Sequence, residues 1–176
     1  MRNIIIVDIE NVSSLNWPYV VEHSISNKTE FIFVGASISR SLLRTCSKFK
    51  NCKYIESIQG NNSADMLICF LIGGIKERNN SDRIVLFTGD KFGRILNSSL
   101  ANLGHGIIVP NLVSADCKRE KNVAINSYLQ CLGILAENDY VAMTNAESTS
   151  VFRGNADMPK PRGIEKITES KRLSTI

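Results

Sequence analysis

The chain has 176 residues, of which 43% are hydrophobic and 22% are charged, and its formal net charge is +4. This is the composition of a globular domain that can bury a core, and the mild positive charge is compatible with nucleic acid without being diagnostic of it. No apolar run is long enough to span a membrane and no signal-peptide pattern precedes the first strand, so we expect a cytoplasmic protein with no membrane partner.

Short apolar runs alternate with amphipathic segments of helical length along most of the chain. The expected strands are Asn3–Val7, Phe31–Val34, Lys53–Glu56, Ile84–Thr88 and Gly106–Val109. The expected helices are Pro18–Ser26, Arg40–Lys50, Ser63–Lys76, Phe92–Leu103 and Arg119–Glu137. Most of the strands are continuous apolar runs, as in parallel sheets that are buried on both faces. The alternation predicts an α/β fold, a three-layer α/β/α sandwich around a central, mainly parallel five-stranded sheet.

The last part of the chain breaks this pattern. Residues 141–176 are rich in Asn, Ser, Thr, Pro and charged residues and contain few large apolar ones. We therefore expect a domain at residues 1–140 followed by a flexible or loosely docked tail, which is also the candidate contact for a protein partner or a second copy of the chain. Val151-Phe152 and Ile164–Ile167 leave open the alternative of a short element packed on the core.

The cysteines and histidines do not indicate a zinc site. Five cysteines are scattered without a C-x-x-C pair, and the two histidines have no zinc-ligand spacing. An odd number of cysteines in an intracellular chain favours reduced thiols, several of them buried, over a disulfide framework.

Three aspartates lie where an open α/β sheet places its ligand site. Asp8 and Asp90 each follow an apolar strand, and Asp65 lies in the first turn of a helix. Each has a structural explanation on its own, Asp8 as a cap, Asp65 through the helix macrodipole and Asp90 as a turn residue. Together they would repel one another, and a hard divalent cation is the usual relief. We therefore expect Asp8, Asp65 and Asp90 to bind Mg²⁺ or Mn²⁺ for chemistry on phosphates, with Asn11 and Thr88 as hydrogen-bonding neighbours.

The order of these motifs resembles a known family. The chain has Asp8-Ile9-Glu10-Asn11 after the first strand, Ser63-Ala64-Asp65 opening a helix, and Thr88-Gly89-Asp90 after the fourth strand. Over roughly Met1 to Glu137, this arrangement resembles the NYN branch of the PIN-like ribonuclease superfamily. The resemblance implies a PIN-like fold and a metal-dependent endoribonuclease that hydrolyses RNA phosphodiester bonds. It also implies that Asp8, Asp65 and Asp90 are the catalytic, metal-binding acids, supported by Asn11 and Thr88.

One position departs from the family pattern. Family members carry a further acid two residues after the aspartate of the fourth-strand motif, where this chain has Phe92. Either Glu10 or Asp116 replaces that acid, or the site holds its metal more weakly. A third outcome is a catalytically inactive relative that binds RNA as an adaptor.

Basic residues provide candidate RNA contacts. Arg40, Arg44 and Lys48 are spaced by four, so they are predicted to share one helix face, with Leu42, Leu43, Cys46 and Phe49 toward the core. Such a face can bind phosphates, although a merely solvated face fits equally well. Lys91 and Arg94 follow Asp90 and are predicted to meet the scissile phosphate. Lys118, Arg119 and Lys121 extend the set.

A third class of function also fits an acid after the first strand. Phosphohydrolases and signalling domains of other doubly wound classes share this feature, but the haloacid-dehalogenase pattern needs D-x-D where this chain has Asp8-Ile9-Glu10. The sequence contains neither of the glycine-rich nucleotide-binding motifs.

Overall fold

The structure is a computed structural model that describes residues 1–12, 15–112 and 118–136. The chain divides into two units, Met1–Met143 and Thr144–Ile176, and all described residues belong to the first. Their elements are, in order, β1 (Asn3–Asp8), α1 (Trp17–Glu22), β2 (Thr29–Gly35), α2 (Arg40–Lys48), β3 (Cys52–Glu56), α3 (Ser63–Arg78), β4 (Arg83–Phe87), α4 (Phe92–Asn102) and α5 (Lys118–Cys131). Within these residues, no helix is both long and apolar enough to cross a membrane.

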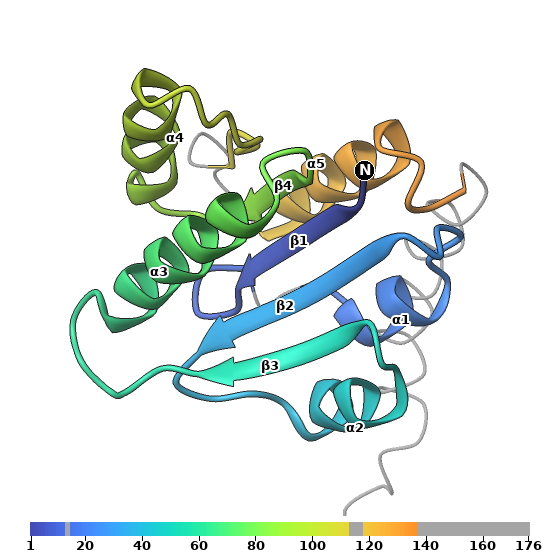
Figure 1. The fold of residues 1–176 in the computed structure, drawn as a ribbon. Coiled ribbons are helices and arrows are strands. Elements are labelled where there is room, and N and C mark those ends of the chain that lie inside the picture. Colours follow the sequence, from blue (N-terminus) through green and yellow to red (C-terminus); the bar gives the residue numbers. More distant parts are fainter. Residues whose placement is uncertain (13–14, 113–117, 137–176) are drawn as a thin grey trace, which may run out of the picture. The chain divides into compact units, whose positions relative to one another are not determined.

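The four strands form one parallel sheet in the order β3-β2-β1-β4 (Figure 1). β1 is central because its apolar run, Ile4 to Val7, is buried on both faces. The chain moves outward from β1 through β2 to β3 and then returns to place β4 on the other side of β1. The order of the strands thus reverses between β1 and β4, and a crevice forms at the carboxyl ends of strands at such a point.

The prediction of a fifth strand is wrong. The described residues form a sheet of four strands. Of the segment Gly106–Val109, only an isolated parallel bridge between Ile108 and Val85 forms beside β4. Ile108 donates to the carbonyl of Ile84 and accepts from the amide of Leu86. Pro110 follows two residues later and has no amide hydrogen to donate, so the ladder cannot continue in that direction.

Helices flank both faces of the sheet. Side chains alternate along a strand, so Ile5 and Val7 of β1 point to one face and Ile4 and Ile6 to the other. The first pair joins a buried cluster with residues of α1, α2 and α5, and the second joins a cluster with residues of α3 and α4. Figure 1 shows α3 crossing the near face of the sheet. The α/β class and the parallel sheet are therefore as predicted.

Three details of the helices differ from expectation. α5, expected to run to Glu137, ends at Cys131. α1 ends at Glu22 rather than Ser26. Leu43 of α2 is 47% exposed rather than in the core. The buried stripe of α2 comprises Leu42 and Thr45, with Cys46 and Phe49 partly buried beside them. These positions recur every three or four residues, and Leu43 lies about 100° around the helix from Leu42.

Candidate active site

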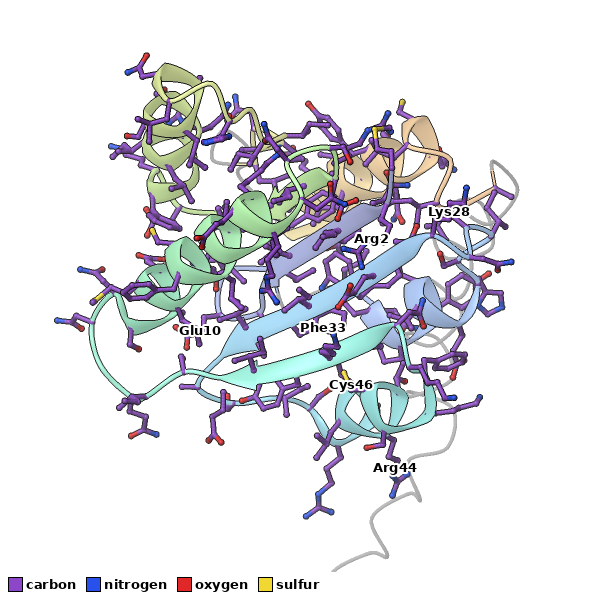
Figure 2. The ribbon with its side chains drawn as sticks, viewed as in Figure 1. Arg2, Glu10, Lys28, Phe33, Arg44 and Cys46 are labelled. Carbon is purple, nitrogen blue, oxygen red and sulfur yellow. The ribbon has the colours of Figure 1, made fainter. Side chains whose placement is uncertain are left out.

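The predicted acids are located at the carboxyl edge of the sheet. Asp8 is the last residue of β1, and Thr88 directly follows β4. Asp65 lies in the first turn of α3, and Asp90 precedes α4 by two residues. Figure 2 shows Glu10 beyond the strand ends to which the arrows point, whereas Arg2 lies at the opposite edge. The structure therefore brings these acids to the carboxyl edge, where the loops that follow β1 and β4 leave the sheet.

Asp8 is buried and held by three hydrogen bonds. Its Oδ1 accepts from the Glu10 amide at 3.2 Å, and its Oδ2 accepts from Asn11 Nδ2 at 2.5 Å and from Thr88 Oγ1 at 3.0 Å. Only 1% of Asp8 is exposed. Buried polar groups need such partners, and these three fix the carboxylate in one orientation. Asn11 and Thr88 thus both donate hydrogen bonds to the Asp8 carboxylate.

Thr88 also links Asp8 to Asp90. Its hydroxyl donates to Asp8 and accepts from the Asp90 amide at 3.2 Å. The exposed Asp90 side chain accepts at Oδ1 from the Lys91 amide at 2.5 Å. A single hydroxyl therefore sets the position of the Asp90 backbone relative to the Asp8 carboxylate.

Asp65 experiences the charges of the other acids. Burial raises its pKa above the ordinary value of 3.8, and the negative charges of Asp8, Asp90 and Glu10 raise it further. Asp65 and Asp90 also line one open cavity of about 430 Å³ between the first turns of α3 and α4, together with Lys91 and Phe92. These carboxylates therefore share one electrostatic environment, in which ionisation of Asp65 is disfavoured.

The residues fit a cation held by few protein ligands. Among the described residues, no group of three or more His, Cys, Asp or Glu side chains is arranged to hold a metal ion. Mg²⁺ usually binds through one or two carboxylates together with waters and substrate phosphates, rather than in a cage made by the protein alone. The buried, oriented carboxylate of Asp8 and the solvent-facing carboxylate of Asp90 are donors of this kind. A cation near Asp65 would also offset the repulsion that raises its pKa.

Glu10 and Asp116 were the candidates to replace the missing family acid. Glu10 Oε1 accepts from the Ala36 amide at 2.8 Å, so this carboxylate is tied to the end of β2. It lines a second cavity, of about 490 Å³, together with Trp17 and Ser39. Asp116 and residues 141–176 lie outside the described residues.

Lys121 approaches the site from α5. A Cβ atom added to Gly89 would lie 3.3 Å from Lys121 Nζ and 3.4 Å from the carbonyl oxygen of Asn11. Gly89 separates Thr88 from Asp90, so this ammonium group lies beside the loop that carries the acids. In the sequence, Lys121 is only one of a run of basic residues, and nothing local to α5 indicates this long-range contact.

The basic residues of α2 and α4 are exposed. Arg40 and Arg44 lie on the outer face of α2, and Figure 2 shows Arg44 pointing away from the sheet. Lys48 forms an ion pair with Glu22 of α1 at 3.6 Å, so its charge is partly offset. Residues 40–53 contain no Asp or Glu, so the counter-charge for Lys48 comes from the neighbouring helix α1. Lys91 and Arg94 are exposed at the start of α4, and Lys91 lies next to Asp90.

The described residues thus define an α/β protein with a parallel sheet and a polar, acid-rich carboxyl edge. No protein-family model matches the chain, and a search of curated proteins finds no match.

Proposed function

We propose that the protein is a metal-dependent endoribonuclease of the NYN branch of the PIN-like superfamily. It would hydrolyse RNA phosphodiester bonds at Mg²⁺ or Mn²⁺ bound through one or two of the carboxylates of Asp8, Asp65 and Asp90, together with waters and substrate phosphate. The observation that supports this most is geometric: the Thr88 hydroxyl joins the buried Asp8 carboxylate to the Asp90 amide at the carboxyl edge of the sheet, and Asp65 lines one cavity with Asp90. Acids that repel one another at the carboxyl edge of a parallel sheet favour a bound cation and a phosphate ligand.

The chain's own residues have distinct roles in this proposal. When bound, the cation supplies an activated water and neutralises charge that develops on the phosphate. Asn11, Thr88 and the Glu10 amide hold the Asp8 carboxylate in place. Lys91, Arg94 and Lys121 supply positive charge for the RNA backbone beside the acids.

Cleavage of single-stranded RNA with and without Mg²⁺ or Mn²⁺ tests the proposal. Asp8→Asn and Asp90→Asn should each lower the rate by at least about 100-fold, because each removes a metal-binding charge while preserving shape. Glu77→Gln is a matched control, since Glu77 is an exposed acid in α3. If both aspartate variants cut RNA at the wild-type rate, the site assignment is wrong.

A catalytically inactive RNA-binding protein is the second candidate. The observation that favours it is Phe92, which packs against the apolar cluster beneath α3 and α4 in place of a family acid. Fluorescence anisotropy of a labelled single-stranded RNA measures binding separately from cleavage. Salt-sensitive binding without metal-dependent cleavage would favour this candidate. Hydrolysis of a phosphomonoester with no action on RNA would favour a phosphohydrolase instead.

A further inference from the structure

Two cysteines face each other at the junction of α2 and β3. Cys46 lies in α2 and is partly buried, whereas Cys52 is the first residue of β3 and is buried. Their Sγ atoms are 3.1 Å apart, and both are free thiols. Figure 2 shows the Cys46 sulfur between α2 and β3. The pair lies away from the acids described above and has no part in the proposed hydrolysis.

The backbone on both sides of the pair is already fixed. The amide of Phe49 donates to the carbonyl of Thr45, and the amide of Cys52 donates to the carbonyl of Phe49. β3 is then paired with β2 from Cys52 onward. Sulfur atoms in a disulfide are about 2 Å apart, so the two thiols need to approach by only about 1 Å to bond.

We propose that Cys46 and Cys52 are a redox modification site that forms a reversible disulfide by exchange with low-molecular-weight disulfides such as oxidised glutathione. The Cys46 thiolate attacks one sulfur of the small disulfide and releases one small thiolate. The Cys52 thiol loses its proton to solvent, and its sulfur then attacks Cys46 Sγ and releases the second small thiolate. Two protein thiols are oxidised and one small disulfide is reduced, so two electrons are exchanged.

The surroundings of the two thiols set the order of attack. The hydrogen bond from Cys52 lowers the pKa of Cys46, and Cys46 is the more exposed of the two. The same hydrogen bond and burial raise the pKa of Cys52. The thiolate is the nucleophile in exchange, so Cys46 reacts first and Cys52 resolves the mixed disulfide.

Tryptic mapping of the full chain tests the pair directly. Lys48 and Lys50 lie between the two cysteines, so trypsin separates Thr45–Lys48 from Asn51–Lys53 unless a disulfide joins them. After oxidised glutathione and alkylation, we expect these two peptides to be linked, and reduction to separate them again. Linkage of other cysteines, with Cys46 and Cys52 both alkylated, would overturn the proposal.

Variants test the order of reaction. Cys52→Ser should stop at a glutathione adduct on Cys46, and Cys46→Ser should show no adduct on the buried Cys52. The double variant Cys69→Ser, Cys131→Ser is the matched control, because both residues are exposed and should not be needed for the link. Persistence of the mixed disulfide on Cys46 in the wild-type protein would show that Cys52 does not resolve it and would contradict the proposal.

Thermal melting gives a readout that does not depend on nuclease activity. The link closes a short loop onto β3, so the oxidised wild-type protein should melt about 5 °C above the reduced form. Neither single variant should show this increase. An oxidised wild-type protein that melts below the reduced form would show that the native geometry does not accommodate the bond.

Discussion

Thr88 shows how one side chain can organise the candidate site. Its hydroxyl has one proton, which it donates to Asp8, and its oxygen accepts from the Asp90 amide. Thr88 is 1% exposed, so water has little access to replace either bond. The position of Asp90 therefore depends on the end of β4, and the orientation of Asp8 depends on the same atom.

Asp65 is predicted to reduce stability at neutral pH. Folding raises its pKa, so between the ordinary value of 3.8 and the folded value the native protein holds more protons than the unfolded chain. Stability then falls as pH rises through this range, and the loss is complete above the folded pKa. Asp65→Asn should therefore raise the free energy of unfolding at pH 7 by less than about 1 kcal/mol, because the partly exposed charge is screened by solvent.

Thermal melts in chelator at several pH values check this prediction. The advantage of the variant should shrink as the pH is lowered toward 3.8. Added Mg²⁺ should raise the melting temperature of the wild-type protein more than that of the variant, because the metal offsets the repulsion. Equal shifts with Mg²⁺ would show that Asp65 does not bind the cation.

Lys121 is predicted to contact the RNA backbone, because its ammonium group lies beside Gly89. Lys121→Ala should weaken RNA binding at all sequences and lower the slope of log affinity against log salt concentration by about 1. Lys121→Arg should restore the slope. Lys28→Ala is the matched control, since Figure 2 shows Lys28 at the opposite edge of the sheet. A salt slope that is unchanged in Lys121→Ala would remove this lysine from the RNA site.

At the scale of elements, the close approach of α4 to β4 supports the site. Gly93, in the first turn of α4, leaves no space for a methyl group, because an added Cβ would lie 2.6 Å from Thr88 Cγ2 and 2.9 Å from Val109 Cγ1. Neither neighbour is the end of a long, flexible side chain. Thr88 must therefore move if Gly93 is enlarged, and its hydroxyl moves with it.

Gly93→Ala is predicted to damage both stability and the site. It should lower the free energy of unfolding by about 1–3 kcal/mol through overpacking, and it should lower cleavage in the fraction that stays folded. Gly73→Ala in α3 is the control, because nothing lies within 4 Å of its added Cβ. That change should raise stability by about 0.5–1 kcal/mol, since alanine is the better helix former. Denaturant unfolding measures both values, and a neutral Gly93→Ala would show that α4 shifts freely.

Sequence patterns predicted the elements whose signal is local. β1 and β4 are continuous apolar runs, and the first turns of α3 and α4 follow recognisable turn residues. The prediction of a fifth strand was wrong because, by pattern alone, an apolar run next to Pro110 cannot be distinguished from other short strands. The prediction that Leu43 faces the core was wrong because Leu42 and Leu43 are equally apolar. The sequence does not show which of the two faces the core.

Contacts between distant elements were not predictable from the sequence. The ion pair between Lys48 and Glu22 and the approach of Lys121 to Gly89 both depend on how helices lie against the sheet. The placement of the three aspartates at one edge followed from the order of strands and helices, which is a property of the whole α/β pattern. Asn11 and Thr88 were expected as hydrogen-bonding neighbours, whereas the link that the Thr88 hydroxyl makes between Asp8 and the Asp90 amide was not predictable from the sequence.

At the scale of the whole molecule, the buried clusters of the described residues join β1 to α5 and to the residues that follow α5. Both buried clusters consist of residues between Ile4 and Leu135. α5 belongs to this core, because Ile125 and Leu129 are buried in the cluster that includes Val7 of β1. Residues 141–176 lie outside the described residues, and their polar composition predicts that they add little to the stability of the core.

A chain that ends at Met143 is therefore predicted to fold and to act like the full chain. It should unfold in one cooperative transition within about 3 °C of the full chain, a difference of about 1 kcal/mol or less for a domain of this size, and should cleave RNA at a similar rate. A chain that ends at residue 117 is the control. Removing α5 loses the burial of Ile125 and Leu129, which stabilises the fold by about 1.5–3 kcal/mol for each side chain. It also removes Lys121. That shorter chain should lose its cooperative transition. Loss of cooperativity already at Met143 would mean that residues after it stabilise the fold, and loss of cleavage alone would place part of the RNA site there.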